Sequence, residues 1–307
     1  MIVSEGPVRS GFFHMCAQGE DAKNFIVSDE DWYMAFNLIG VCAAMNPDVR
    51  VVAFSIEDTH PHGLLLGSKI SCENFCKAYS RKYARYIVMT RGWCDDVTLN
   101  FNVIPVVEES HLMNVGTYVI AQATKDGKKI MPYDYLWGTG SMYFRSSTHI
   151  PIWLIGNGMT VIRPKRIGDL TIRERRSLLH MKNDVVPDDW MVANGFLLPD
   201  NYVDKRLFEN IYKTHNRFRV FCSISNKVFQ EVNTIIASYN GVSMEDQEAR
   251  RVCLDTCREL FGTGDSRRLD MSRRLQLAQI IRRKYKLSIR QVSSLTHIPE
   301  QELRKYL

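Results

Sequence analysis

The 307-residue chain contains no apolar run that approaches the roughly 18 residues of a membrane-spanning helix. Its first residues, MIVSEGPVRSGFF, also lack the basic start and the long apolar stretch of a secretory signal peptide. The apolar fraction of 45% and the charged fraction of 24% are those of an ordinary globular protein. We therefore expect a cytoplasmic protein with no membrane partner.

The eight cysteines form no C-x-x-C pair, the spacing most typical of a structural zinc site. Cys72 and Cys76 are four residues apart within a helical pattern, as are Cys253 and Cys257, and the other four stand alone. Reduced thiols are the rule in the cytoplasm. A disulfide framework is therefore not expected, and a zinc site has little support.

Acidic residues are scarce in the last part of the chain. From residue 266 to 307, eleven lysines and arginines face three acids, which gives this segment a net charge of +8 although the whole chain carries +6. A basic module beside a near-neutral body indicates a polyanionic partner, and nucleic acid is the usual one. A solvated basic helix face would carry the same charge and is the alternative.

Strand and helix patterns alternate through the first 145 residues. Strands are predicted at 11–18, 49–58, 60–67 and 97–107. Helices are predicted from an N-cap at Ser28, from a capping serine at Ser71, and from residue 108 to Gly127. The order β-α-β-β-α-β-α predicts an α+β fold, with a ferredoxin-like split βαβ arrangement and an antiparallel sheet.

The rest of the chain is predicted to divide into two parts. Residues 148–261 form a mainly helical middle region to which the sequence assigns no role, and residues 266–307 form the basic module. The module has the pattern of three short helices, the last two beginning near Ser288 and Pro299 and joined by a tight turn. We expect a DNA-binding helix-turn-helix, with a helical cap on the preceding domain as the alternative.

The candidate site begins with two of the eight histidines, His60 and His62, which flank one proline in a predicted strand. Residues two apart in a strand point to the same face, so both imidazoles could bind one metal ion. On the pair alone, a half-exposed strand start is the simpler interpretation. Tyr118 and Gln122, one helical turn apart, add a hydroxyl nucleophile and an oxygen ligand.

Together these residues resemble a known family. The His-Pro-His sequence at 60–62 resembles the His-hydrophobic-His signature of HUH single-strand endonucleases, and Tyr118 with Gln122 resembles the Tyr-x-x-x-Gln motif of their single-tyrosine transposases. The stretch MPYDYLWGTGSMYF is similar to the Pro-x-x-Tyr-x-Trp-Ser-Ser stretch of REP-associated tyrosine transposases, some of which carry a C-terminal helix-turn-helix. The resemblance implies an HUH catalytic domain over residues 10–147.

The resemblance also implies a reaction. The protein would be a DNA transposase or single-strand endonuclease that cleaves and rejoins DNA, at hairpin-forming repeats, through a 5′-phosphotyrosine on Tyr118. It would bind Mg²⁺ or Mn²⁺ through His60, His62 and Gln122, and the ion would stabilise the charge of the transition state. Single-stranded or hairpin DNA is the expected partner.

Two departures concern the subgroup within this family. Glu57-Asp58-Thr59 stands where the REP-associated group has Met-Pro-Asn. Gln122-Ala123 stands where that group has Asn-Pro. Glutamine at this position is closer to the insertion-sequence transposases, and the subgroup stays open.

Other tyrosines and several cations accompany the motif. Tyr79, Tyr83 and Tyr86 recur at helical spacing, which favours packing on the sheet over a catalytic role. Cations interleaved with these tyrosines, and cations of the basic module, are the predicted DNA contacts. These contacts are Arg81, Lys82, Arg85, Arg282, Arg283, Lys284, Arg290, Arg304 and Lys305.

Two further functions compete with the nuclease. One is a sequence-specific DNA-binding regulator whose HUH domain binds DNA without cleaving it. The other is a zinc-dependent module that uses His60, His62, Cys72 and Cys76. Either a monomer or a homodimer agrees with the sequence.

Overall fold

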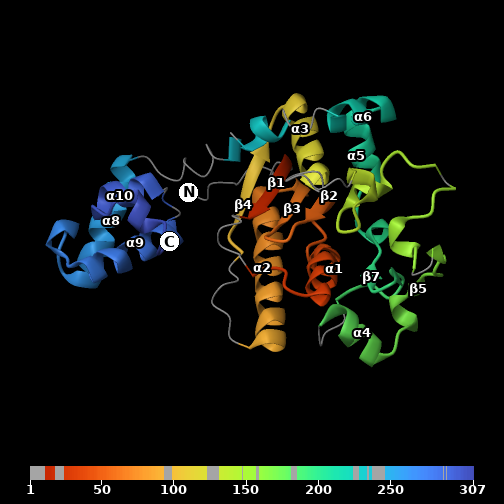
Figure 1. Cartoon of the computed structure of the whole chain (residues 1–307), viewed down its shortest axis with the longest axis horizontal. Helices are drawn as coiled ribbons and strands as arrows, with labels where there is room; N and C mark the ends of the chain where they lie inside the picture. The colour runs from red at the N-terminus through yellow and green to blue at the C-terminus, as the bar shows by residue number, and fades with distance from the viewer. Residues whose placement is uncertain are drawn as a thin grey trace, which may run out of the picture. The chain divides into compact units, whose positions relative to one another are not determined.

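A four-stranded antiparallel sheet organises the N-terminal part of the computed structural model (Figure 1). Its strands are β1 (Gly11–Ala17), β2 (Arg50–Ile56), β3 (Pro61–Gly67) and β4 (Phe101–Val106). Their order across the sheet is β2-β3-β1-β4, so that β1 lies between β3 and β4 although it comes first in the chain. The predicted α+β class with an antiparallel sheet is confirmed.

The chain divides into two units, residues 1–232 and 233–307. No helix among the described residues is long and apolar enough to cross a membrane. The structure describes residues 11–17, 24–92, 99–122, 131–146, 148–156, 159–180, 185–223, 228–233, 235–236, 246–285, 287 and 289–307. Gly127 and Ser288, predicted as a helix end and a helix cap, lie outside these ranges.

Helices α1 (Asp29–Met45) and α2 (Lys69–Arg91) cover one face of the sheet (Figure 1). The ring of Phe36 in α1 packs on Phe54 of β2, and Tyr79 in α2 packs on Phe101 of β4. Aromatic side chains on both helices are thus buried between these helices and the sheet.

Serine caps start both helices. Ser28 caps α1, as the sequence predicts, and it forms a reciprocal capping box with Asp31. α2 begins earlier than predicted, because the hydroxyl of Ser68 accepts from the Ser71 amide and thereby caps the helix. Ser71 itself lies inside the first turn.

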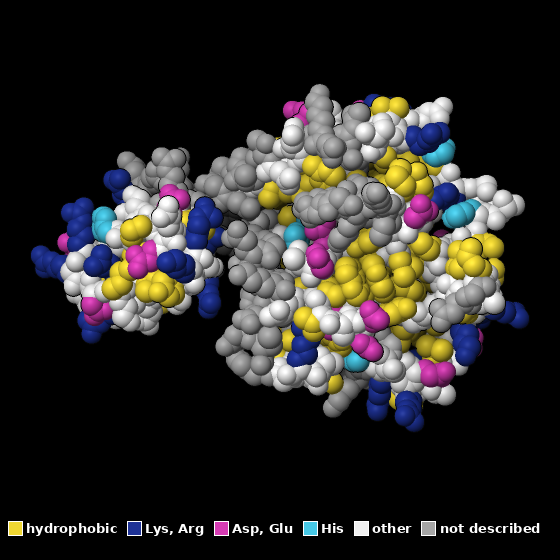
Figure 2. Space-filling model, viewed as in Figure 1, with side chains coloured by type: hydrophobic (Ala, Val, Ile, Leu, Met, Phe, Trp, Pro, Cys, Tyr) yellow, Lys and Arg dark blue, Asp and Glu magenta, His cyan; other side chains and the backbone are white. Residues whose placement is uncertain are grey.

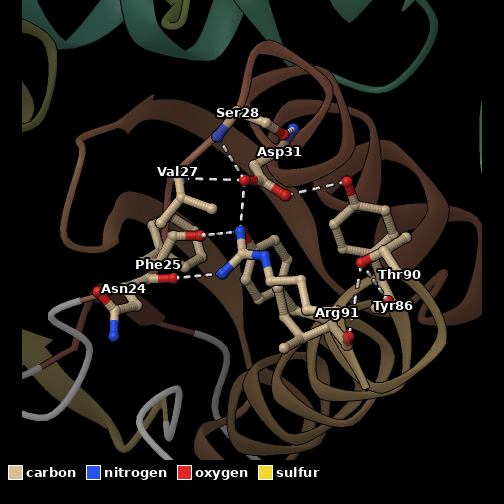
Figure 3. A network of polar contacts seen from close by, with 10 residues as sticks. Asn24, Phe25, Val27, Ser28, Asp31, Tyr86, Thr90 and Arg91 are labelled. Atoms are coloured by element: carbon tan, nitrogen blue, oxygen red, sulfur yellow. Dashed lines mark hydrogen bonds and ion pairs between the residues drawn. The ribbon is translucent and has the colours of Figure 1, made fainter. Parts of the chain in front are cut away.

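A buried ion pair ties α1 to the end of α2 (Figure 3). Arg91 donates to the carboxylate of Asp31, which also accepts from the Tyr86 hydroxyl and from the backbone amides of Val27 and Ser28. The side chain of Asp31 is 2% exposed and that of Arg91 is 18% exposed. The network therefore keeps an ionised carboxylate away from water, and each of its two oxygens accepts at least one hydrogen bond.

Helix α3 (Glu109–Ile120) covers the opposite face of the sheet, where Tyr118 packs on His14 of β1. Helix α5 (Lys205–Tyr212) lies against α3, and the Tyr212 hydroxyl donates to the Met113 carbonyl at 2.7 Å. A Cβ atom on Gly116 would stand 2.8 Å from this hydroxyl. The close approach of the two helices thus requires glycine at this position.

The stretch 135–143 closes the outer edge of β2. The Ile56 amide donates to the Trp137 carbonyl at 2.8 Å, and the Tyr143 hydroxyl donates to the Val52 carbonyl at 2.7 Å. Most of the stretch that resembles the REP-associated transposases is therefore a cover for the sheet edge.

The region 148–232 belongs to the same unit as the sheet, and the boundary predicted near residue 148 does not separate two units. The reason is a set of long-range hydrogen bonds. The Asn37 amide group of α1 donates to the Gly195 carbonyl and accepts from the Leu197 amide, both at 2.8 Å. A carbonyl of β2, on Val51, accepts from the Asp204 amide.

This region contains short elements. A small sheet consists of β5 (Lys165–Arg166), β6 (Met191–Ala193) and β7 (Phe196–Leu197), joined to helices α4 (Ile172–Leu179) and α6 (His215–Ser223). Asn194-Gly195, both with positive φ, form the turn between β6 and β7. The 3₁₀ helices with described bounds include Pro132–Asp134, Thr139–Met142, Ile152–Leu154, Ile167–Asp169, Pro199–Asn201 and, in the C-terminal unit, Ser266–Arg268.

The C-terminal unit is helical. Its helices with described bounds include α8 (Asp246–Phe261), α9 (Met271–Tyr285), α10 (Ile289–Thr296) and α11 (Glu300–Leu303). α8, which the sequence pattern placed in the middle region, supplies Ala249, Cys253 and Cys257 to the core of this unit. Residues 297–299 join α10 to α11, with His297 in the left-handed conformation.

Candidate functional site

The predicted histidines lie on a tight hairpin between β2 and β3. Ile56 pairs with Pro61, and the Glu57 amide donates to the His60 carbonyl, so only Asp58 and Thr59 form the turn. Glu57 follows Ser55 by two residues, and Ser55 pairs with His62. The side chains of Glu57, His60 and His62 therefore share one face of the sheet.

Strand β1 adds two residues that the sequence patterns did not single out. Cys16 pairs directly with His62, and His14 lies two residues before Cys16, so both side chains point to the face of the histidines. The rings of His14 and His62 stack with centroids 5.9 Å apart. About forty-five residues separate β1 from β3, and only the long-range strand pairing brings these side chains together.

Tyr118 projects from α3 onto this face. Its ring meets His14 and His62 edge-on, with both centroid distances at 5.4 Å. Gln122, one turn further along the chain, is 1% exposed, and Tyr118 is 3% exposed. The structure thus brings His60, His62 and Tyr118 together, and Gln122 lies beside the Tyr118 hydroxyl.

Burial determines the protonation of the site. It raises the pKa of the Tyr118 hydroxyl, and the charges of Cys16 and Glu57 act in the same direction, while Gln122 opposes them. Burial also lowers the pKa of His14 to about 3, with smaller contributions from His111 and His60. At neutral pH, Tyr118 is a phenol and His14 is a neutral imidazole.

Two groups of side chains on this face have the composition and spacing of metal ligands. One is Glu57, His60 and His62, and the other is His14, Cys16 and His62. Within each group, one donor atom per residue lies within 4.8 Å of the others. Carboxylate and imidazole donors suit Mg²⁺, Mn²⁺ or a transition metal, so the first group fits the ion that the family resemblance implies.

Hydrogen-bonding and charged atoms lie close to the two histidine rings of the Glu57–His60–His62 group. The Thr59 hydroxyl lies 2.8 Å from Nδ1 of His60, and Glu57 Oε2 lies 3.9 Å from Nε2 of His62. A hydrogen bond on one ring nitrogen fixes how the other is presented to a ligand. Glu57 was visible in the sequence as the residue three before His60, but its place in the site depends on the length of the turn.

The zinc alternative that uses Cys72 and Cys76 is wrong for the part of the chain that the structure describes. Both cysteines are buried in α2, on the far face of the sheet, and neither joins a metal-ligand group with His60 and His62. The competing tyrosines of α2 also have structural roles. The hydroxyls of Tyr79, Tyr83 and Tyr86 donate to Ala35, Phe25 and Asp31, respectively.

The cations predicted on α2 do not join the site. Arg81 and Arg85 are exposed and Lys82 is half-buried, and they belong to the helix that covers the face away from Tyr118. These cations and Tyr118 therefore lie on opposite faces of the sheet.

The predicted cations of the basic module lie in the C-terminal unit, and Figure 2 shows Lys and Arg over much of its visible surface. Arg283, Lys284, Arg304 and Lys305 are exposed, whereas Arg282 donates to the Leu287 carbonyl at 2.9 Å. Arg304 and Lys305 follow the end of α11 and are not part of the helix predicted to carry them. The side chain of Arg290 lies outside the described residues.

No protein-family model, no curated protein and no solved structure matches this chain. The geometry of the site and the residue types within it are therefore the basis for a functional conclusion.

Proposed function

We propose that the chain is a metal-dependent DNA transposase or single-strand endonuclease of the HUH single-tyrosine kind, with Tyr118 as its nucleophile. The observation that carries this proposal is the position of Tyr118, edge-on to both His14 and His62, beside a carboxylate–imidazole group. A hydroxyl next to a candidate metal site is what phosphoryl transfer through a covalent tyrosine intermediate requires.

The connectivity of the sheet supports the proposal. A β-α-β-β-α-β chain with the strand order β2-β3-β1-β4 is the connectivity of a ferredoxin-like split βαβ arrangement, which the family resemblance implies. His62 is on β3, an interior strand of the sheet, His60 directly precedes that strand, and the tyrosine is on the helix that follows β4.

In the proposed reaction, the hydroxyl oxygen of Tyr118 attacks a phosphorus atom of the DNA backbone. A phosphotyrosine bond forms, the bond to the 3′ oxygen breaks, and that oxygen leaves as a 3′-hydroxyl group. One phosphoester replaces another, so the reverse step can rejoin DNA without ATP. Because burial raises the pKa of Tyr118, its proton must be removed during the attack.

Glu57, His60 and His62 would hold the ion, with Gln122 as the neighbouring neutral oxygen. A bound Mg²⁺ or Mn²⁺ would polarise a phosphate oxygen and stabilise the charge of the transition state. The sequence pattern offered Gln122 as the oxygen ligand of the ion. We now assign that role mainly to Glu57, because it contributes an anionic oxygen within 4.8 Å of both imidazole donors.

Phe229 restricts access to the nucleophile. Its ring lies 5.2 Å from that of Tyr118, centroid to centroid, and both side chains are buried. A DNA strand must displace Phe229 before a phosphate can reach the tyrosine hydroxyl. We therefore include DNA-induced opening of this contact in the proposal.

The test is the formation of covalent adducts between the protein and labelled hairpin DNA in Mg²⁺. We expect Tyr118→Phe to form none while it binds the DNA as tightly as the parent, because only the attacking oxygen is removed. Tyr79→Phe is the matched control, since it removes a buried hydroxyl on the opposite face. Adducts that persist in Tyr118→Phe would refute the assignment of the nucleophile.

A further inference from the structure

The second group of metal-ligand side chains, His14, Cys16 and His62, differs in chemistry from the group that contains Glu57. It combines a thiol with two imidazoles, a donor set that selects zinc and other thiophilic ions over Mg²⁺. All three residues are buried, and their donor atoms lie within 4.8 Å of one another. Ligands of a tetrahedral zinc ion stand about 3.5 Å apart, so a small contraction would complete the site.

The strands hold this arrangement in place. Cys16 and His62 are direct partners in the β1–β3 pairing, and His14 lies on the same face two residues away. Both strands are interior to the sheet, since β1 lies between β3 and β4, and β3 lies between β2 and β1. Ligands on two paired interior strands are positioned more rigidly than ligands on loops.

His14 gives independent evidence for a ligand. It is 1% exposed, and its Nε2 atom has no hydrogen-bond partner among the described residues. A buried polar atom without a partner destabilises a fold, and such atoms are therefore uncommon. A bound ion at this position would satisfy it.

We propose that His14, Cys16 and His62 bind a thiophilic divalent ion, with Zn²⁺ as the ordinary biological one, and that this ion competes with the Glu57–His60–His62 group for His62. A neutral imidazole has one nitrogen lone pair to give, so His62 serves one ion at a time. On binding, Cys16 loses its proton to solvent and the S–H contact to the Ala17 carbonyl, 3.5 Å long, is replaced by the sulfur–metal bond.

The competition has a consequence for the site as a whole. An ion in the thiol group lies beside Tyr118, whose ring contacts both of the histidines involved. This ion would be bound by His62, so the Glu57–His60–His62 group would have only Glu57 and His60 left as ligands for Mg²⁺ or Mn²⁺. This consequence rests on the proposed function, whereas the binding of the thiophilic ion does not.

The experiment uses the full-length, metal-free protein and Co²⁺ as a spectroscopic substitute for Zn²⁺. We expect a near-ultraviolet thiolate-to-cobalt charge-transfer band that Zn²⁺ abolishes. Cys16→Ser should lose the band, and Cys72→Ser, which changes a buried cysteine on the far face of the sheet, should keep it. His14→Ala should weaken Zn²⁺ binding at least about tenfold, since even an outer-shell partner contributes that much.

The variant His60→Ala separates the two groups. It removes a ligand from the Glu57 group only, so the charge-transfer band should remain, and excess Mn²⁺ should no longer weaken cobalt binding. The absence of a band in the parent protein at saturating Co²⁺ would overturn the inference, as would a band of full strength in folded Cys16→Ser. If the cobalt band forms but the cobalt-free protein in Mg²⁺ forms no DNA adducts, the result would support the ion site and count against the nuclease.

Discussion

Asp31 is a carboxylate almost completely removed from water, and its neighbours decide whether it stabilises the fold. Burial raises the pKa of its carboxyl, but hydrogen bonds from Val27, Tyr86 and Ser28 and the charge of Arg91 together lower it below the ordinary value. A carboxyl with a lowered pKa in the folded state stabilises that state at pH values above its unfolded pKa, about 3.9. This contribution is lost as the pH falls through the folded value.

We expect Asp31→Asn to lower the free energy of unfolding by about 3 kcal/mol at pH 7, because Arg91 is left without its buried partner. The difference from the parent should shrink as the pH falls to about 3 and below. Urea unfolding at both pH values measures it. Asp29→Asn, an exposed acid in the same helix turn, is the control and should change the stability by less than about 1 kcal/mol. An equal loss in both variants would contradict the role of the pair.

The position of helix α3 is tightly constrained, because this helix carries Tyr118 and packs against α5 through a glycine. Gly116→Ala should gain about 1 kcal/mol of helix propensity but lose about 1–3 kcal/mol through overpacking against Tyr212. We expect net destabilisation and slower adduct formation, since α3 must move away from α5. In a Tyr212→Phe background, where the hydroxyl at 2.8 Å is gone, the same substitution should destabilise the protein by less than in the parent.

A thermal or urea unfolding series on the four proteins of this double-mutant cycle measures the coupling. Stabilisation by Gly116→Ala in the parent background would mean that the two helices separate without cost, and the glycine would then have no packing role. Partial recovery in the double variant is expected, because Phe208 also lies 3.3 Å from the added carbon.

The elements also show how far the sequence predicts this site. His60, His62, Tyr118 and Gln122 were accessible because strand and helix periodicities place each pair on one face without knowledge of the fold. Glu57 was missed because its face depends on a turn of only two residues, and one residue more would have reversed it. His14 and Cys16 were missed because they reach the site through pairing between distant strands, which leaves no local pattern in the sequence.

At the scale of the molecule, the division into units changes where the chain can be shortened. The sequence pattern ends the middle region at residue 261 and begins the basic module at residue 266. In the structure, however, α8 contributes Ala249, Cys253 and Cys257 to the core shared with α9 and α10. A cut near residue 262 would leave that apolar face of α8 uncovered. The division observed at residues 232 and 233 keeps each core whole.

We expect residues 1–232 alone to fold and to retain the proposed metal site, but to bind hairpin DNA more weakly than the full chain. The slope of log affinity against log salt should become shallower by about 0.9 for each phosphate that the shortened protein no longer neutralises, because every neutralised phosphate releases counterions. Titration of both proteins on one hairpin at several salt concentrations measures the slopes. Equal affinities with equal slopes would mean that the cations of the C-terminal unit do not bind DNA.

The closed edge of β2 bears on how the protein behaves when it is concentrated or partly digested. A sheet edge with open amide and carbonyl groups recruits strands from other chains and starts aggregation. Here the Ile56 amide and the Val52 carbonyl of β2 form hydrogen bonds with Trp137 and Tyr143, respectively. In the opposite edge strand, β4, Pro105 has no amide proton to donate. A protease that cuts within 135–143 would thus expose the open hydrogen-bonding groups of β2 while the core is still folded. The nicked protein should then precipitate well below the unfolding temperature of the intact chain.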